Sequence, residues 1–163
     1  MSVKPYMIKT LIVDDEENSV ETLKIMLNEN FNNIEIIGSA KSMETGVKAI
    51  NDLKPDLVFL DIRMPDGNGF ELLDRVGNKK FEVIFTTAYD EYALRAFEFS
   101  ALHYLLKPIN VDELRDAVNR FRYDMKGVLL NERLKVHKDL MEKKGEKIML
   151  NTNDGVSMIL LHE

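Results

Sequence analysis

The stretch LVFLDIRMPDG, residues 57–67, decides the fold because its character changes at a single residue. Residues 57–60 are apolar at every position, which is typical of a strand buried on both faces in a parallel sheet covered by helices. Asp61 follows at once, and Pro65 and Gly67 indicate a loop. We therefore expect the Asp61 carboxylate to lie where this strand ends, at the mouth of the sheet.

The same alternation of strand and helix recurs five times along the chain. The predicted strands are 8–13, 34–37, 57–60, 83–85 and 104–106, and the predicted helices are 18–30, 42–53, 70–76, 91–99 and one from Val111. Such alternation predicts an α/β fold with a doubly wound parallel sheet, (βα)5. In known flavodoxin-like folds the strand order is 2-1-3-4-5, which makes the first and third strands neighbours. That order is taken from known folds of this class.

Composition limits the possible classes of protein. The chain has 163 residues, a net charge of −6 and no cysteine. It can hold one core of ordinary domain size with a short remainder, and it lacks the basic excess that favours nucleic-acid binding. Disulfides and thiolate metal sites are excluded, and no apolar run is long enough to span a bilayer. We expect a cytoplasmic protein without membrane contact.

The C-terminal part has its own pattern. Apolar residues spaced three and four apart from Val111 predict a long amphipathic helix, and a second apolar stripe predicts a helical linker over 126–145. Residues 146–163 contain Asn153-Asp154-Gly155 between two apolar runs, which indicates a β-hairpin. Two strands alone are marginally stable, so this hairpin is predicted to open a second domain that the chain cuts short. The first domain is then 1–125.

Polar side chains gather where the predicted strands end. Asp14 and Asp15 follow the first strand, Asp61 the third, Thr87 ends the fourth and Lys107 follows the fifth. Converging carboxylates repel one another and raise a pKa unless a cation neutralises them, and an open cluster of oxygen ligands suits Mg²⁺. Taken singly, the paired aspartates could cap a helix, and Thr87 and Lys107 could be ordinary surface or strand residues. Their joint arrangement favours a site.

These residues resemble the receiver domains of two-component response regulators. The resemblance covers residues 7 to about 122: the paired acids after the first strand, LDIRMPDGNGFELL around the third, and FTTAYDEYALRAFEFSALHYLLKPI across the fourth and fifth. Each part alone is a weak signal, and the parts in order are a strong one.

The resemblance implies a role for each site residue. Asp61 would be the phosphoacceptor, taking a phosphoryl group from a phosphohistidine on a sensor histidine kinase. The roles implied for the remaining residues are as follows: Asp15, Asp61 and the backbone carbonyl of Arg63 as Mg²⁺ ligands, Asp14 as a ligand through water, Lys107 and Thr87 as phosphate-binding residues, Thr87 and Tyr104 as switch residues. The Lys107–Pro108 bond resembles the cis peptide of the family.

The tail KIMLNTNDGVSMILLHE, residues 147–163, resembles the first hairpin of LytTR-type DNA-binding domains. This implies transcriptional control through a C-terminal domain beyond the chain, so no DNA-binding residue can be named. We also expect a homodimer through the face formed by the fourth helix, fifth strand and fifth helix.

Two other functions compete with this interpretation. One is a Mg²⁺-dependent phosphatase or phosphotransferase with an aspartyl-phosphate intermediate, in which a second aspartate two positions on acts as acid and base. Arg63 stands at that position. The other is a receiver that acts only through protein contacts. We therefore expect a phosphoacceptor switch and not an enzyme with a separate substrate.

Overall fold

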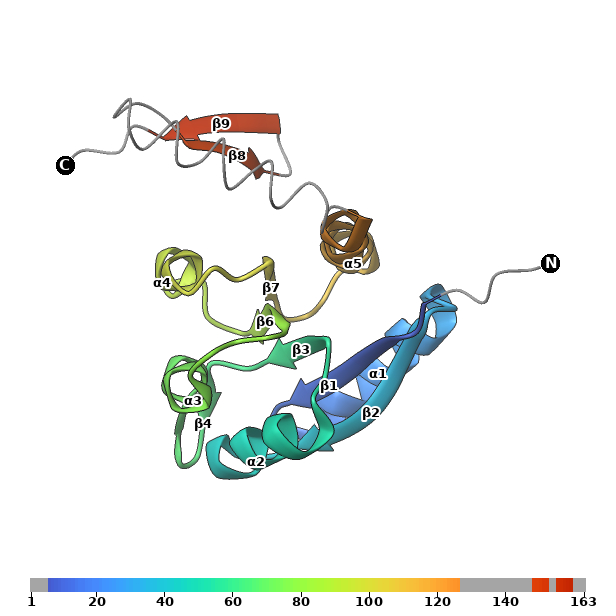
Figure 1. Cartoon of the computed structure of the whole chain (residues 1–163), viewed down its shortest axis with the longest axis vertical. Coiled ribbons are helices and arrows are strands. Elements are labelled where there is room, and N and C mark those ends of the chain that lie inside the picture. Colours follow the sequence, from blue (N-terminus) through green and yellow to red (C-terminus); the bar gives the residue numbers. More distant parts are fainter. Residues whose placement is uncertain (1–5, 127–147, 153–154, 160–163) are drawn as a thin grey trace. The chain divides into compact units, whose positions relative to one another are not determined.

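A five-stranded parallel sheet forms the centre of the N-terminal unit in the computed structural model, which describes residues 6–126, 148–152 and 155–159. The strands are β1 (Ile8–Val13), β2 (Ile34–Ala40), β3 (Leu57–Leu60), β6 (Glu82–Thr87) and β7 (His103–Leu106). Their order is β2-β1-β3-β6-β7 (Figure 1). This order confirms the predicted doubly wound sheet, with β6 and β7 as its fourth and fifth strands.

Strand β2 is three residues longer than the sequence pattern predicts. Gly38, Ser39 and Ala40 pair with the last three residues of β1, after a register shift between Thr10 and Leu11. The segment is short of apolar residues, so the hydrophobic pattern ends before the strand does. Backbone pairing with β1, which no local pattern encodes, extends it.

In the described part of the chain, five helices cover the two faces of the sheet. They are α1 (Glu17–Asn30), α2 (Met43–Leu53), α3 (Gly69–Val76), α4 (Ala93–Glu98) and α5 (Val111–Lys126). One buried cluster joins the sheet to residues of α2, α3 and α4, and a second joins it to residues of α1 and α5. Helix α4 is shorter than the predicted 91–99, because Glu91 and Tyr92 belong to the loop that precedes it.

The loop after β3 contains a short two-stranded antiparallel sheet. Strand β4 (Arg63–Met64) pairs antiparallel with β5 (Gly67–Asn68), directly before α3. The Asp66 carboxylate accepts hydrogen bonds from the Met43 and Glu44 amides, at 2.8 and 3.0 Å, and so caps the start of α2. Asn68 caps α3 by accepting from the Glu71 amide at 2.9 Å. The residues that follow Asp61 are therefore tied to two helices.

The C-terminal unit begins at Arg122. Its strands β8 (Ile148–Thr152) and β9 (Gly155–Ile159) pair antiparallel, with Thr152 opposite Gly155, so the predicted hairpin is present. Of the predicted linker over 126–145, residues 127–145 lie outside the described residues, as do residues 146–147, 153–154 and 160–163 of the predicted hairpin segment. The predicted domain boundaries remain predictions.

Two further observations complete the fold. The Lys107–Pro108 peptide bond is cis. Among the residues that the structure describes, no helix combines the length and the apolar character needed to cross a membrane.

Candidate functional site

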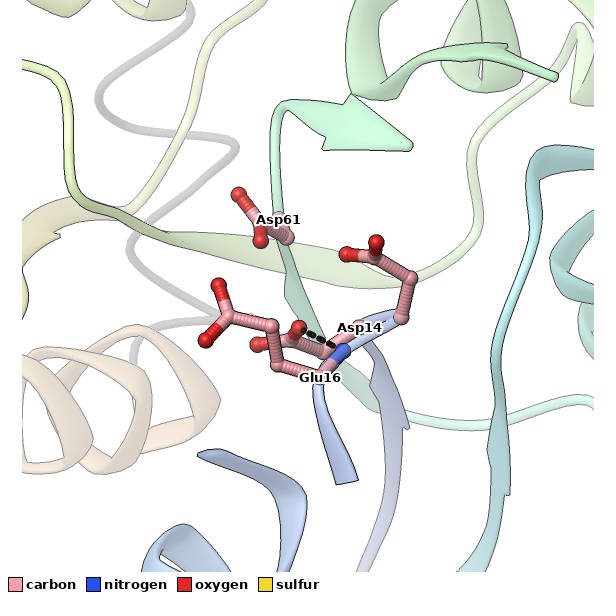
Figure 2. Close-up of side chains that lie close together, drawn as sticks. Asp14, Glu16 and Asp61 are labelled. Atoms are coloured by element: carbon pink, nitrogen blue, oxygen red, sulfur yellow. Dashed lines mark hydrogen bonds between the residues drawn. The ribbon is translucent and has the colours of Figure 1, made fainter. Parts of the chain in front are cut away.

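Carboxylates from two neighbouring strands meet at one edge of the sheet. Val13 and Leu60 are partners in the β1–β3 ladder, so Asp14 and Asp61, the next residue of each strand, emerge side by side. Each of Asp14, Asp15, Glu16 and Asp61 offers a carboxylate oxygen, and these oxygens all lie within 4.8 Å of one another. Figure 2 shows Asp14, Glu16 and Asp61 pointing into this shared space. Asp14 and Asp61 are buried, whereas Asp15 and Glu16 are exposed.

Lys107, which follows the outer strand β7, brings a positive charge to the carboxylates at the same edge of the sheet. Its Nζ atom lies 2.8 Å from Asp14 Oδ2, 3.1 Å from Asp61 Oδ2 and 3.5 Å from Glu16 Oε1. The Lys107 amide donates to the Thr87 carbonyl at 2.8 Å, which ties the residue to the end of β6. One ammonium group thus contacts three of the four carboxylates, and the cluster keeps a surplus of negative charge.

The charges in this cluster shift the pKa values of two groups. Burial raises the pKa of Asp61 to about 6, with a further rise from the Asp14 charge that Lys107 and the Ile62 amide oppose. Burial lowers the pKa of Lys107, but its hydrogen bond with Asp14 and the charges of both aspartates outweigh this, and the net direction is upward. Lys107 is therefore a cation at neutral pH, while burial makes the charged form of Asp61 less favourable than it is in water.

Mg²⁺ fits this arrangement of donors. The ion takes hard oxygen ligands and commonly uses one or two carboxylates together with water and phosphate oxygens. The cluster offers several carboxylate oxygens within one ion's reach, and their mutual repulsion exceeds what one ammonium group offsets. Asp14, Asp15 and Asp61 are the residues that would hold the ion. The Arg63 carbonyl stays a prediction as a further ligand.

The backbone of Asp61 is held by a close approach of α3. A Cβ atom built on Gly69 would lie 2.7 Å from the Asp61 carbonyl oxygen, so a side chain here needs the backbone to move. The Gly69 amide donates to the Ile62 carbonyl at 2.7 Å. Glycine at this position lets the start of α3 pack directly on the peptide unit of Asp61, which restricts the backbone of that residue.

Thr87 ends β6, the strand beside β3, and Tyr104 lies on β7, the next strand beyond β6. Thr87 is fully buried, and its hydroxyl accepts a hydrogen bond from the Tyr89 amide at 3.4 Å. Tyr104 pairs with Phe85 across the β6–β7 ladder, and its hydroxyl donates to the Tyr89 carbonyl. Both residues therefore bond the backbone of Tyr89. Their roles in phosphate binding and switching remain predictions.

Glu16 and the Arg63 side chain were missed by the sequence analysis. Glu16 completes the acidic cluster, and it could have been found as the third consecutive acid after β1. Glu16 is also the N-cap residue of α1, so that position belongs to neither Asp14 nor Asp15. The Glu16 side chain makes no capping hydrogen bond. Arg63 was expected to contribute its backbone alone, yet its side chain contacts Tyr89, Glu91 and Tyr92.

Comparison with known proteins agrees with the fold and identifies the family. The family model described as response regulator receiver domain matches residues 10–119. An uncharacterized response regulatory protein of Vibrio cholerae serotype O1 is 48% identical over 115 residues, which are 70% of this chain and 48% of that protein. The transcriptional regulatory protein BtsR of Escherichia coli K12 is 42% identical over 119 residues, 72% of this chain and 49% of that protein. The chain thus spans about half the length of these curated relatives.

A solved structure shows the same architecture. The response regulatory domain of protein mrkE from Klebsiella pneumoniae superposes with a TM-score of 0.67 at 29% identity, covering 73% of this chain and 98% of that domain. The family match covers more than half of the chain, and it spans the strands that carry Asp14, Asp61, Thr87 and Lys107. The chain belongs to the response regulator receiver family.

Proposed function

We propose that this receiver is switched by phosphorylation of Asp61 by a sensor histidine kinase, and that it controls transcription. The contact of Lys107 with both Asp14 and Asp61 carries the proposal. It places one fixed positive charge against a buried carboxylate whose surroundings are otherwise negative. The excess negative charge of such a site favours binding of a divalent cation. The cation and Lys107 together then favour binding of the negative phosphoryl oxygens.

Transfer requires a charged nucleophile and neutralised phosphoryl oxygens. An Asp61 carboxylate oxygen attacks phosphorus in line, the new O–P bond forms, and the P–N bond to the imidazole breaks with its electron pair left on nitrogen. Lys107, already bonded to Asp61 Oδ2, is placed to pair with a phosphoryl oxygen. The Ile62 amide holds Asp61 Oδ1 at 2.7 Å, so that the carboxylate keeps one orientation. A bound Mg²⁺ supplies charge that offsets the negative phosphoryl oxygens.

The direct test uses a small phosphodonor in place of the kinase. Incubation of the chain with acetyl phosphate and Mg²⁺ is expected to add one phosphoryl group, measured by intact mass, that hydroxylamine removes as it does other acyl phosphates. Asp61→Asn should abolish the adduct. Asp74→Asn, which changes an exposed acid on α3, should leave it intact. An adduct that persists in Asp61→Asn overturns the assignment, and rapid multiple turnover of the donor favours a phosphatase.

We infer that the output is a LytTR-type DNA-binding domain of which residues 146–163 are the start. Support comes from the β8–β9 hairpin, from relatives of which the matched segment covers only 48% and 49%, and from the name of BtsR as a transcriptional regulatory protein. The test is whether the gene encodes a basic, β-rich continuation after Glu163. If it does, the longer protein should bind DNA with an affinity that falls steeply as salt rises.

We also propose that phosphorylation promotes a homodimer through the face of α4, β7 and α5. Leu94 is 84% exposed, Phe97 51% and Leu106 41%, so apolar side chains face solvent on adjacent elements. Sedimentation with beryllofluoride and Mg²⁺ should show a doubled mass, and Leu94→Asp should prevent it. Ile25→Asp is the matched control, because Ile25 is 55% exposed on α1. An unchanged mass with beryllofluoride argues against the dimer.

A further inference from the structure

The Arg63 side chain reaches from the loop after β3 to the loop between β6 and α4, residues 88–92. Its Nε and Nη2 atoms donate to the Tyr92 hydroxyl at 3.2 and 3.1 Å, and Nη2 also lies 3.2 Å from Glu91 Oε1. Its Cζ atom lies 3.8 Å from the centroid of the Tyr89 ring. A guanidinium group can donate in its plane while its face stacks on an aromatic ring, and both contacts are made here.

The base of this side chain is firmly held. Arg63 pairs with Asn68 in the β4–β5 ladder, Asn68 caps α3, and Asp66 in the same loop caps α2. Arg63 also stands two residues after Asp61. A change at Asp61 that moves this loop therefore moves the guanidinium group with it.

Arg63 stacks on Tyr89, and the hydroxyl groups of Thr87 and Tyr104, the predicted switch residues, both bond the backbone of Tyr89. The Tyr89 amide donates to the Thr87 hydroxyl, and the Tyr89 carbonyl accepts from the Tyr104 hydroxyl. Tyr104 is half-buried against the core cluster, with its ring centroid 6.3 Å from that of Phe85. Whatever fixes Tyr89 also fixes the acceptor that keeps Tyr104 in this position.

We propose that the Arg63 side chain is a positioning residue that links the phosphoacceptor loop to Tyr104 through Tyr89, alongside the link through Thr87. This inference rests on the proposed function, because a link of this kind matters only if phosphorylation of Asp61 controls the face of α4 and β7. Arg63 holds Tyr89 where its carbonyl accepts from Tyr104. Loss of the guanidinium group frees the loop and lets Tyr104 leave its half-buried position.

The ion pair with Glu91 is not what carries this link. The Arg63 and Glu91 side chains are 52% and 58% exposed, and exposed ion pairs contribute little. The contacts with the tyrosines are connected to the core, since the centroid of the Tyr92 ring lies 6.2 Å from that of the buried Phe70 ring. Glu91→Gln should therefore have no effect on Tyr104, whereas Tyr92→Phe, which removes the acceptor oxygen and keeps the ring, should have part of the effect of Arg63→Ala.

The test follows Tyr104 directly in the full chain, without metal or phosphodonor. Fluorotyrosine is incorporated, the Tyr104 ¹⁹F resonance is assigned with Tyr104→Phe, and its solvent exposure is measured as line broadening by a neutral gadolinium chelate. Arg63→Ala should raise the broadening at least twofold, and Arg63→Lys should restore only part of the protection. Tyr6, outside the sheet, serves as an internal reference in every variant.

Arg95→Ala is the matched control. Arg95 also stacks on an aromatic ring, with its Cζ atom 4.5 Å from the Phe70 centroid, but it belongs to α4 itself. Its loss should leave the broadening of Tyr104 unchanged. Equal effects of Arg63→Ala and Arg95→Ala, or no effect of Arg63→Ala and Tyr92→Phe, overturn the proposal.

A second measurement separates this proposal from the proposed function. Beryllofluoride with Mg²⁺ should shift the Tyr104 resonance in the wild-type chain, and the shift should be smaller in Arg63→Ala. If beryllofluoride leaves the wild-type resonance unchanged, phosphorylation does not reach Tyr104 and the switch fails. The measurement without beryllofluoride still decides whether Arg63 positions Tyr89 and Tyr104.

Discussion

The Lys107 ammonium group lies 3.1 Å from Asp61 Oδ2, although the two residues are 46 positions apart in the chain. The contact forms because β3 and β7 both end at the same edge of the sheet, with β6 between them. The ion pair is part-buried, and its charges do not balance, because Asp14 and Glu16 contact the same ammonium group. The consequences of this inequality can be measured as stability, metal binding and pH dependence.

Asp61→Asn is expected to stabilise the protein at neutral pH. The folded-state pKa of Asp61 is raised from 3.8 to about 6, so the folded chain holds a proton that the unfolded chain releases, and the unfolding free energy falls as pH rises through this window. Asparagine removes this cost, which corresponds to about 1 to 3 kcal/mol. In metal-free urea titrations the gain should be full above pH 6 and should shrink as pH falls towards 4.

Asp66→Ala should act in the opposite direction and is the control for that measurement. Hydrogen bonds from the Glu44 and Met43 amides lower the pKa of Asp66, so its stabilisation is present at neutral pH and lost as pH falls through the acidic range. Its removal should destabilise the chain at pH 7. A gain in stability from both substitutions would show that the effect does not come from the buried charge of Asp61.

Lys107→Ala should destabilise the protein at pH 7 and raise the pKa of Asp61 above about 6. Without the ammonium group, the buried acids Asp14 and Asp61 have lost the cation that both of them contact. Removing one partner of a buried ion pair costs about 3 kcal/mol. The loss should be smaller at pH 5, where a proton replaces the lysine. Carboxyl ¹³C titration gives the pKa, and Lys24→Ala, which breaks an exposed pair with Glu21, should change neither quantity.

Mg²⁺ is expected to raise the unfolding free energy of the unphosphorylated chain. Binding to the folded state alone contributes about 2.7 kcal/mol at a hundred times the dissociation constant. Asp15→Ala, which removes an exposed carboxylate of the cluster, should abolish most of this stabilisation. Asp52→Ala, which removes an exposed acid on α2, should preserve it. Equal stabilisation of the Asp15 and Asp52 variants would place the ion elsewhere.

Gly69→Ala should destabilise the chain and disturb Asp61. The new Cβ atom would lie 2.7 Å from the Asp61 carbonyl oxygen, and relief of such overpacking typically costs about 1 to 3 kcal/mol. Gly38→Ala is the control, because its Cβ atom would meet the flexible end of Leu53 at 3.1 Å. Urea denaturation and acetyl phosphate labelling should both be impaired in Gly69→Ala. A variant that matches Gly38→Ala in both would show that α3 does not position the acceptor.

Local sequence determined the elements of the sheet and the residues at its edge. Runs such as 57–60 are apolar throughout because both faces of the sheet are covered, and the acids, threonine and lysine that follow the strands lie where the parallel strands end. The order of the strands came from known folds of the same class. The structure agrees with that order, and it brings Asp14, Asp15 and Asp61 together.

Tertiary structure alone decided the contacts between loops. Pairing with β1 extended β2 past its apolar run, Asp66 capped a helix 22 residues away, and Arg63 reached the loop before α4. Hydrophobic periodicity records only whether a position faces the core, so it identifies buried strands and helix faces. A polar side chain in a loop carries no such period, and its partner is set by which loops the folded sheet brings side by side.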